Sequence, residues 1–283
     1  MLTKAPSTSS APLPRIGDQA TWQCALDELR TREKAATREL DAIAAQRRSL
    51  PAVVLPDYTL EGPEGPVRLV DVFDGHRQLI VYNHMWELGA TWQCGGCTSF
   101  TAQFTRLDFL EPYDARFVIV TQGPIDDALE YKRRVGNQMD WYSTADSPFG
   151  ADMGAPPNAG FAVNVFLRGD DGTVYRTWQT DGRGTEQLSH TFPLIDLLPY
   201  GRQEEWQSAP EGWPQGPAYC GWLGSDQIGE MYGEVENAKA GCKSESTWSF
   251  EFGAKVPLGG ESKPGPGEFP PASKIGPSFI WRF

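Results

Sequence analysis

The sequence predicts an α/β fold built around a parallel pair of strands, and three observations support this prediction. Two apolar runs rich in strand-forming residues, 79–82 and 116–120, have the length of buried strands. A helical pattern follows each run, and strands that alternate with helices are usually parallel neighbours in one sheet. Further along, Asp171-Gly172 between two apolar segments is a strong signal for an antiparallel hairpin.

The first structured element is predicted to be a long helix over residues 18–49, preceded by a leader over residues 1–17. The leader is rich in Ser, Thr and Pro without periodicity, which is typical of a mobile segment. Asp18 is placed to cap the helix and Pro51 ends it. The middle of the helix is almost wholly polar, so we expect it to lie along a surface, either as a packing helix or as an interaction arm. Its apolar face comprises Trp22, Ala25, Leu26, Leu29, Leu40, Ile43 and Ala44.

The central strand and the helix after it form the middle of the predicted domain. Extended segments at 53–58 and 67–73 precede the strand at 79–82 and predict a hairpin or a paired edge. After the strand, apolar residues recur at steps of three and four, which predicts one amphipathic helix. These residues are Phe100, Phe104, Leu107 and Leu110.

The second half of the domain follows the same alternation. A helix over 124–135 comes after the strand at 116–120 and begins with a proline. Strands at 161–167 and 173–178 make the hairpin, and a short helix is predicted near 188–198. A parallel pair, then an antiparallel hairpin and a final helix, is the order of a thioredoxin-like fold.

The loop between the central strand and its helix holds Cys94-Gly95-Gly96-Cys97, which puts two thiols at a helix N-terminus. Unpaired amides and the helix macrodipole favour a negative charge there, and the thiolate is the reactive form of cysteine. In such settings the pKa of a cysteine falls from about 8.5 to roughly 3.5–7.5, so Cys94 is a candidate nucleophile at neutral pH. Cys97, one turn later on the same face, is placed to attack a mixed disulfide on Cys94 and release the product.

Two other interpretations of this pair stay open. A Cys-X-X-Cys motif is also half of a structural zinc site, but such a site normally needs a second pair of Cys or His ligands. The remaining cysteines, Cys24, Cys220 and Cys242, form no such pair. The third interpretation is two buried cysteines that pack without chemistry. The strand-to-helix setting favours the redox pair.

His84 lies at the carboxyl end of the predicted central strand, the edge of an open α/β sheet where ligands bind. If its ring faces the helix after Cys94, His84 is either a base for a thiol or a third metal ligand beside Cys94 and Cys97. One imidazole and two thiolates suit copper(I), or zinc with a fourth ligand from water or substrate. A histidine that is hydrogen-bonded at the edge of the core is the equally weighted alternative.

A series of short motifs runs in order through about residues 20–206. They are Gln46-Arg47-Arg48-Ser49-Leu50-Pro51, Asp71-Val72-Phe73-Asp74-Gly75, Cys94-Gly95-Gly96-Cys97-Thr98, Tyr131-Lys132-Arg133-Arg134-Val135-Gly136, Trp141 with Ser143, Val165-Phe166-Leu167-Arg168 and Ile195-Asp196-Leu197-Leu198-Pro199-Tyr200-Gly201-Arg202. In this order the motifs resemble the DUF899 family, whose members are thioredoxin-like and are predicted to be dithiol-disulfide oxidoreductases. The resemblance implies a thioredoxin-like domain over 18–206 with Cys94 and Cys97 as its redox pair. The chain reads Asn-His-Met-Trp over 83–86 where the family has His-Phe-Met-Phe, so the histidine has moved one place along.

Residues 207–283 follow the matching region and are rich in Pro and Gly. They also hold Trp213, Trp222, Trp248 and Trp281, although disordered segments are usually poor in aromatic residues. We therefore expect a loop-rich C-terminal extension that packs on the core and is anchored by these rings. A lid over the Cys94 loop, a dimer interface and simple surface packing are the alternatives for its role.

The composition limits the partners and the compartment. A formal net charge of −12 and a pI near 4.8 argue against nucleic acid or an anionic membrane as the main partner. No run reaches the length of a membrane helix, and the N-terminus lacks the apolar region of a secretory signal. Five cysteines without framework spacing favour a reducing cytoplasm.

Together these features predict a cytoplasmic thioredoxin-like thiol–disulfide oxidoreductase in which Cys94 attacks, Cys97 resolves and His84 carries protons. The expected substrate is a small-molecule or protein thiol or disulfide, and this exchange requires no cofactor. The alternative is a copper- or zinc-binding protein, with oxidase or oxygenase chemistry among its activities, in which Cys94, Cys97 and His84 are the ligands. A binding protein with idle thiols is the third hypothesis, and a homodimer is an expectation under each.

Overall fold

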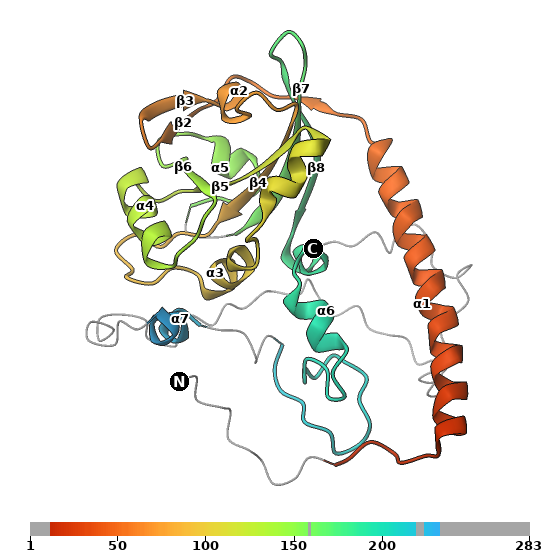
Figure 1. The fold of residues 1–283 in the computed structure, drawn as a ribbon. Coiled ribbons are helices and arrows are strands. Elements are labelled where there is room, and N and C mark those ends of the chain that lie inside the picture. Colours follow the sequence, from red (N-terminus) through yellow and green to blue (C-terminus); the bar gives the residue numbers. More distant parts are fainter. Residues whose placement is uncertain (1–11, 158–159, 219–223, 233–283) are drawn as a thin grey trace, which may run out of the picture. The chain divides into compact units, whose positions relative to one another are not determined.

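The computed structural model describes residues 12–157, 160–218 and 224–232. The predictions for residues 1–11 lie outside the described residues, as do those for Cys220, Trp222, Cys242, Trp248 and Trp281. Residues 12–17 of the predicted leader form neither helix nor strand and are exposed. Figure 1 labels the elements of the chain, and these labels are used below.

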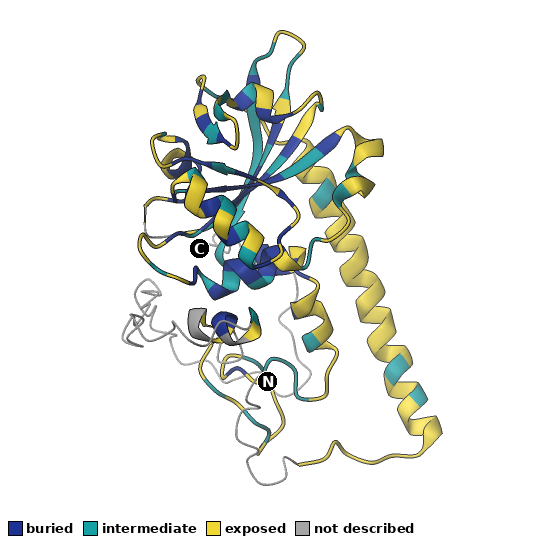
Figure 2. Cartoon of the chain, turned by 60° about the vertical axis from the view of Figure 1, so that its left-hand side comes forward, coloured by how far each residue is buried: buried dark blue, intermediate teal, exposed yellow. Residues whose placement is uncertain are grey.

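The long N-terminal helix is α1 (Gln19–Arg48), which agrees with the prediction. The carboxylate of Asp18 caps it by accepting a hydrogen bond from the backbone N–H of Thr21 at 2.7 Å. No residue of α1 is buried (Figure 2). Trp22 is 55% exposed. In the last turn, the guanidinium of Arg47 lies 4.6 Å from the centroid of the Trp178 ring. The C-terminal end of α1 thus contacts the sheet through this cation–π pair.

Within the described residues, eight strands form one sheet in the order β1-β8-β7-β4-β5-β6-β2-β3. The strands are β1 (Val53–Val54), β2 (Thr59–Gly62), β3 (Gly65–Arg68), β4 (Gln78–His84), β5 (Ala115–Thr121), β6 (Asp140–Ser143), β7 (Ala162–Arg168) and β8 (Val174–Asp181). The edge hairpin is β2 and β3, which pair antiparallel, and it lies mostly between the two segments for which a pairing was predicted. Of the predicted segments, 53–58 contributes β1, which pairs with β8, and most of 67–73 forms the helix Leu69–Val72. β6 was not predicted, because its four residues are too short for a clear pattern.

The four strands at the centre have the thioredoxin-like arrangement that the sequence predicts. β4 and β5 are parallel, with Val81 opposite Val118. β7 lies antiparallel to β4 on its other side, and β8 lies antiparallel to β7. The order β5-β4-β7-β8 therefore holds a parallel pair and an antiparallel hairpin in one layer. The chain is a thioredoxin-like α/β protein with a long N-terminal helix.

β4 is buried on both faces, which explains its nearly continuous apolar sequence. Leu79 and Val81 point to one face of the sheet and pack in a cluster with Val118 and Phe166. Ile80 and Tyr82 point to the other face, where the helices after β4 and β5 lie. The side chain of Tyr82 thereby reaches the helix that carries Cys97.

Apart from α1 the helices are short, and several are single turns. They are α2 (Leu69–Val72), α3 (Gly95–Ala102), α4 (Ile125–Arg134), α5 (Phe149–Asp152), α6 (Thr191–Asp196) and α7 (Ser225–Tyr232), with 3-10 helices η1 (Leu107–Tyr113) and η2 (Gly182–Leu188). α4 matches its prediction within one residue at each end. None of the described helices combines the length and the apolar character that a membrane crossing needs.

The prediction of one amphipathic helix through Leu110 is wrong. α3 ends at Ala102, and η1 is a separate 3-10 helix. The hydroxyls of Thr98 and Thr101 each bond the carbonyl four residues earlier, at 2.9 Å, and such bonds weaken a helix. The apolar residues do pack together, because Phe104 contacts Phe100 and Phe117. The backbone at Phe104, however, is not helical.

The final helix is also shorter than the predicted range 188–198, because Leu188 still belongs to η2. The side chain of Gln103, just after α3, holds the start of α6. Its Oε1 accepts hydrogen bonds from the backbone N–H groups of His190 and Thr191 at 2.8 and 3.0 Å. The start of α6 is therefore capped by the side chain that follows α3. The two segments are far apart in sequence, so local sequence does not reveal this cap.

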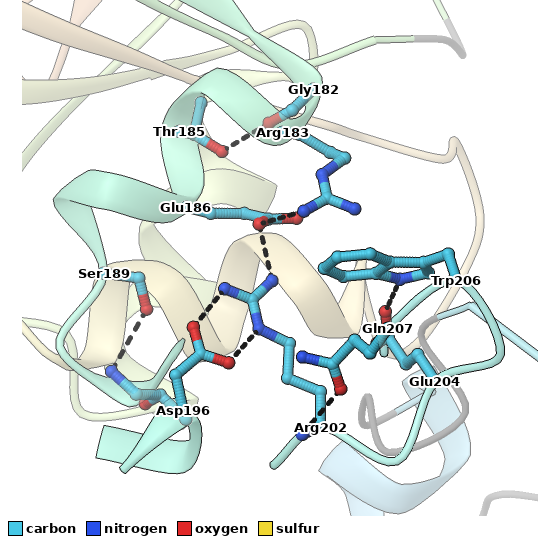
Figure 3. Close-up of polar contacts among 11 residues, drawn as sticks. Gly182, Arg183, Thr185, Glu186, Ser189, Asp196, Arg202, Glu204, Trp206 and Gln207 are labelled. Atoms are coloured by element: carbon cyan, nitrogen blue, oxygen red, sulfur yellow. Dashed lines mark hydrogen bonds and ion pairs between the residues drawn. The ribbon is translucent and has the colours of Figure 1, made fainter. Parts of the chain in front are cut away.

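Arg202, Glu186 and Asp196 form a compact ionic group that we call the arginine cluster (Figure 3). The guanidinium of Arg202 donates to both carboxylate oxygens of Asp196, at 2.8 and 2.7 Å, and to Glu186 at 2.6 Å. The Cζ atom of this guanidinium lies 4.4 Å from the centroid of the Phe192 ring. The side chain of Arg202 is only 10% exposed, so the cluster fastens α6 and the segment after it to η2.

Candidate functional site

The two cysteines of the predicted motif occupy the N-terminus of α3. Cys94 is the N-cap residue, and its sulfur accepts a hydrogen bond from the backbone N–H of Cys97 at 3.4 Å. Cys94 is half-buried, Cys97 is 2% exposed, and both are free thiols. The pair therefore lies in the strand-to-helix setting that the sequence predicts, with one accessible thiol and one enclosed thiol.

Three polar side chains hold the loop between β4 and α3. Gln93 is buried, accepts a hydrogen bond from the N–H of Glu87 at 2.7 Å and donates to the carbonyl of Ala90 at 3.0 Å. Arg134 of α4 donates to the carbonyl of Thr91 at 2.6 Å. Thr98 donates to the carbonyl of Cys94 and shares a second hydrogen bond with the hydroxyl of Tyr131 at 2.7 Å. These bonds fix the backbone on both sides of Cys94.

The two thiols have opposite electrostatic environments. The thiol of Cys97 donates a hydrogen bond to the sulfur of Cys94, and this bond, with the backbone N–H groups of Cys97 and Gly96, lowers the pKa of Cys94 to about 7 against the effect of burial. Burial raises the pKa of Cys97 well above its ordinary value, and its bond to Cys94 raises it further. At neutral pH about half of Cys94 is thiolate and Cys97 is a thiol.

Tyr82 of β4 is a member of the site that the sequence interpretation missed. It is buried and packs in one cluster with Cys97 and Phe100, and its hydroxyl and the backbone N–H of Met85 lower the pKa of Cys97 against the larger effect of burial. Side chains two apart in a strand share a face, so the position of Tyr82 two residues before His84 was the available signal.

His84 is the last residue of β4, as predicted, and is 3% exposed. Its Nδ1 lies 2.8 Å from the carbonyl oxygen of Met85, so Nδ1 carries the proton and Nε2 has the free lone pair. Burial lowers the pKa of His84 to about 4. Its ring packs beside Trp141 and Tyr131, with centroids 5.1 and 6.0 Å away.

The structure does not join His84 to the two thiols. None of the interactions that shift the pKa of Cys94 or Cys97 involves His84, and the buried Nε2 has no hydrogen-bond partner in the described part of the chain. Its assignment as a proton carrier therefore stays a prediction. Among residues 12–157, 160–218 and 224–232, no three His, Cys, Asp or Glu side chains are grouped as metal ligands would be. His84, Cys94 and Cys97 thus do not fit the copper or zinc site of the alternative hypothesis in this arrangement.

The described part of the C-terminal extension reaches the cysteine loop. The ring of Tyr232 in α7 stacks on Trp92, with centroids 6.2 Å apart and planes 20° apart. A Cβ atom at Gly229 would lie only 2.6 Å from Nε1 of Trp92, so α7 and the Trp92 ring are in close contact. Ile228 is buried in the same cluster as Trp86 and Trp92. α7 therefore covers the segment two residues before Cys94.

Three solved structures illustrate the similarity to known proteins. A Chlorobium tepidum protein described as a thiol:disulfide interchange protein DsbE is 19% identical, with 48% of this chain and 89% of that chain covered and a TM-score of 0.34. Peroxidoxin BcpB from Mycobacterium tuberculosis is 15% identical, with 47% and 85% covered and a TM-score of 0.35. A cysteine-to-serine mutant of Xanthomonas campestris peroxiredoxin Q is 16% identical, with 44% and 79% covered and a TM-score of 0.31. No curated protein matches the chain.

The family comparison covers most of the chain. The model of the family described as "Bacterial protein of unknown function (DUF899)" matches residues 11–223. This range includes the sheet, the cysteine loop and the arginine cluster, and it extends beyond residue 206, where the motif series ends. α7 lies after it. The chain belongs to the DUF899 family.

Proposed function

We propose that this protein is a thiol–disulfide oxidoreductase in which Cys94 is the nucleophile and Cys97 is the resolving thiol. The observation that carries the proposal is the geometry of the pair: Cys94 is the N-cap of α3, its sulfur accepts a hydrogen bond from the N–H of Cys97, and Cys97 is buried. This arrangement lowers the pKa of Cys94 and raises the pKa of Cys97. Opposite shifts in adjacent groups are typical of sites that divide one reaction between two residues. The two thiols also differ in exposure, because Cys94 is half-buried and Cys97 is buried.

The proposed exchange has two steps. The thiolate of Cys94 attacks a disulfide R–S–S–R, forms a mixed disulfide Cys94–S–S–R and releases one R–S⁻. The Cys97 sulfur then loses its proton to solvent and attacks the sulfur of Cys94, which releases the second R–S⁻ and leaves a Cys94–Cys97 disulfide. Two electrons pass from the protein to the substrate, and a dithiol returns the protein to its reduced form. The proposed substrates are small-molecule or protein disulfides and thiols, and the exchange uses no cofactor.

Trapping tests the proposal directly. The Cys97→Ser protein, incubated with oxidised glutathione, is expected to accumulate glutathione on Cys94, because nothing resolves the mixed disulfide. Peptide mass spectrometry measures the adduct. The wild-type protein is expected to show the Cys94–Cys97 disulfide instead, and Cys94→Ser is expected to show neither product at this loop. Cys24→Ser removes an exposed thiol outside the motif and serves as the matched control.

Two results would contradict the proposal. One is a wild-type protein that gains neither the adduct nor the internal disulfide. The other is a protein as purified whose thiols resist alkylation until a chelator is added and which contains near-stoichiometric copper or zinc, since thiolates in a metal site are protected. Metal content should therefore be measured on the same sample.

A further inference from the structure

The long helix α1 carries large apolar side chains that the rest of the described chain leaves exposed. Figure 2 shows the helix exposed along nearly its whole length. Contacts at the two ends attach it, one through Arg47 on the Trp178 ring and one through the carbonyl of Pro12, which accepts a hydrogen bond from the hydroxyl of Tyr200 at 3.1 Å. Exposed apolar side chains that share one face mark an interaction surface. On α1 these side chains are between 39% and 55% exposed, and they are Trp22, Leu29, Leu40 and Ile43.

The exposed face of α1 repeats with the spacing of a coiled coil. Steps of four and three residues alternate along it without a break, which is the seven-residue repeat that keeps one stripe of a helix turned toward a partner helix. We call these residues the α1 stripe. They are Trp22, Leu26, Leu29, Glu33, Ala36, Leu40, Ile43 and Arg47. The repeat indicates that the occupant of this surface is another helix.

The α1 stripe is complementary to itself in the antiparallel direction. Its midpoint lies between Lys34 and Ala35, and residues at equal distances on either side of that point form matching pairs. A second copy of α1, laid antiparallel, brings each pair together twice because the arrangement has twofold symmetry. Branched apolar residues then face each other on both sides of the centre, and the small Ala36 leaves room for the Glu33 carboxylate to reach water. The pairs are Trp22 with Arg47, Leu26 with Ile43, Leu29 with Leu40, and Glu33 with Ala36.

Charged residues favour the antiparallel direction over the parallel one. Beside the stripe, Arg32 of one helix flanks Glu39 of the second copy in the antiparallel pair, so two contacts of opposite charge form. In a parallel pair, Glu33 faces Glu33 of the second copy in the middle of the interface, and this contact is repulsive. The connection also fits, because α1 leads into β1 through its C-terminal end and the two sheets lie at opposite ends of an antiparallel pair.

We infer that two copies of this chain form a dimer through their α1 helices, which pair antiparallel about a twofold axis beside Lys34 and Ala35. From Trp22 to Arg47 the stripe is about 38 Å long, and a helix presents a face about 10 Å wide. Two such faces bury on the order of 1,000 Å² in total, which is the lower end for a specific interface. The inference goes beyond the proposed function and does not depend on it.

Sedimentation velocity of the full chain tests the interface. At about 100 µM the wild-type protein should sediment as a dimer of the 31.3 kDa chain. Leu29→Glu places a carboxylate against Leu40 of the second copy, twice by symmetry, and should raise the dissociation constant more than about 30-fold. Because Leu29 is exposed, the variant should keep the wild-type circular dichroism. Ala45→Glu is the matched control. It adds the same charge at an exposed position on the opposite side of α1 and should change the constant less than about twofold.

Disulfide pairing tests the direction of the helices. Leu26→Cys and Ile43→Cys are combined in one chain that also carries Cys24→Ser, and the protein is oxidised gently. The antiparallel pair should join position 26 of one copy to position 43 of the other. The two positions of a single helix cannot join, because they lie about 25 Å apart along its axis. Peptide mass spectrometry identifies which positions are joined.

Three results would overturn the inference. One is a wild-type protein that sediments as a monomer at about 100 µM. Another is equal dimerisation of Leu29→Glu and Ala45→Glu, which would place the interface elsewhere. The third is a set of disulfides that join 26 to 26 and 43 to 43, the pattern of a parallel pair. This readout does not depend on the stability of Leu29→Glu. None of the three results bears on the dithiol exchange, which the trapping experiment tests separately.

Discussion

The dithiol site and the arginine cluster are both polar groups held among aromatic rings, yet they differ in how their charges are balanced. In the arginine cluster, Arg202 meets two carboxylates with three hydrogen bonds between 2.6 and 2.8 Å. In the dithiol site, one sulfur is partly ionised with no cation among the groups that shift its pKa, and the other is a buried thiol with a raised pKa. Balanced charge stabilises a fold, whereas unbalanced charge is available for chemistry.

Secondary structure contributes to the same difference. The arginine cluster joins the end of α6 to η2, and its carboxylates bond a guanidinium instead of backbone amides. Cys94 is the N-cap of α3, so the unpaired amides of the first turn are aimed at its sulfur. The comparison predicts that substitutions in the arginine cluster lower the free energy of unfolding and leave thiol reactivity unchanged. Substitutions at the dithiol site should change thiol reactivity and have little effect on the free energy of unfolding.

The largest effect is expected at Arg202. Arg202→Ala leaves the carboxylate of Glu186, whose side chain is 9% exposed, without its closest counter-charge, and we expect a loss of about 3–5 kcal/mol in the free energy of unfolding. Urea denaturation measures it. The alkylation rate of Cys94 in the folded variant should equal that of the wild type. Arg106→Ala is the control, because its ion pair with Asp108 is exposed and screened by water, so its loss should change the free energy of unfolding far less. Equal losses of unfolding free energy in Arg202→Ala and Arg106→Ala would contradict the stabilising role of the arginine cluster.

The next effect concerns His84 and acid. Its pKa is about 4 in the folded protein and about 6.5 in an unfolded chain, so below pH 6.5 the unfolded state binds a proton that the folded state does not. The free energy of unfolding should therefore fall by up to about 3 kcal/mol through this residue as the pH drops from 6.5 to 4. His84→Phe is expected to flatten the pH dependence in this window, and the exposed His190→Gln is not. Parallel wild-type and His84→Phe curves would show that His84 is not buried as a neutral ring.

A smaller effect is the pH dependence of Cys94 alkylation. With a pKa near 7, the thiolate fraction rises about tenfold between pH 6 and pH 8 and then levels off. Iodoacetamide labelling of Cys94, followed by mass spectrometry, should show this rise with its midpoint near pH 7. Labelling of the exposed Cys24 in the same samples is the internal reference. A midpoint at or above pH 8.5 would give Cys94 the behaviour of an ordinary cysteine.

The smallest effect is expected at α7. Tyr232→Ala removes the ring that stacks on Trp92, a contact worth about 0.5–1.5 kcal/mol, and should loosen the cover over the cysteine loop. We expect Cys94 to react roughly threefold faster with a bulky maleimide, and at an unchanged rate with iodoacetamide. Met231→Ala changes an exposed neighbour and is the control. An unchanged rate of reaction between Cys94 and the maleimide would show that α7 does not cover the cysteine loop.

The fold was predictable because its central signals are local. The run at β4, the helix caps at Asp18 and Pro124 and the hairpin before β8 each follow from neighbouring residues, and they confirm the predicted order of elements. The ends of α3 and α6 were not predictable in the same way. The start of α6 depends on Gln103, whose side chain bonds His190, 87 positions away in sequence. No window of neighbouring residues contains that information.

The site was predictable to the extent that spacing determines it. Two cysteines three apart at a strand-to-helix junction share one helix terminus, and the structure has them there. Tyr82 was missed because an apolar strand supplies no reason to single out one aromatic residue, and Cys97, with which it packs, lies 15 positions away. His84 was placed correctly at the strand end, but sequence could not show that its ring turns toward Trp141.

The measurement that tests the central claim most directly is the relative rate at which Cys94 and Cys97 are alkylated in the reduced wild-type protein at pH 7. Brief iodoacetamide pulses and peptide mass spectrometry give both rates in one sample. The division of roles predicts that Cys94 reacts more than about 30-fold faster than Cys97, since one is partly thiolate and accessible and the other is a buried thiol. Equal rates, or a faster Cys97, would contradict it.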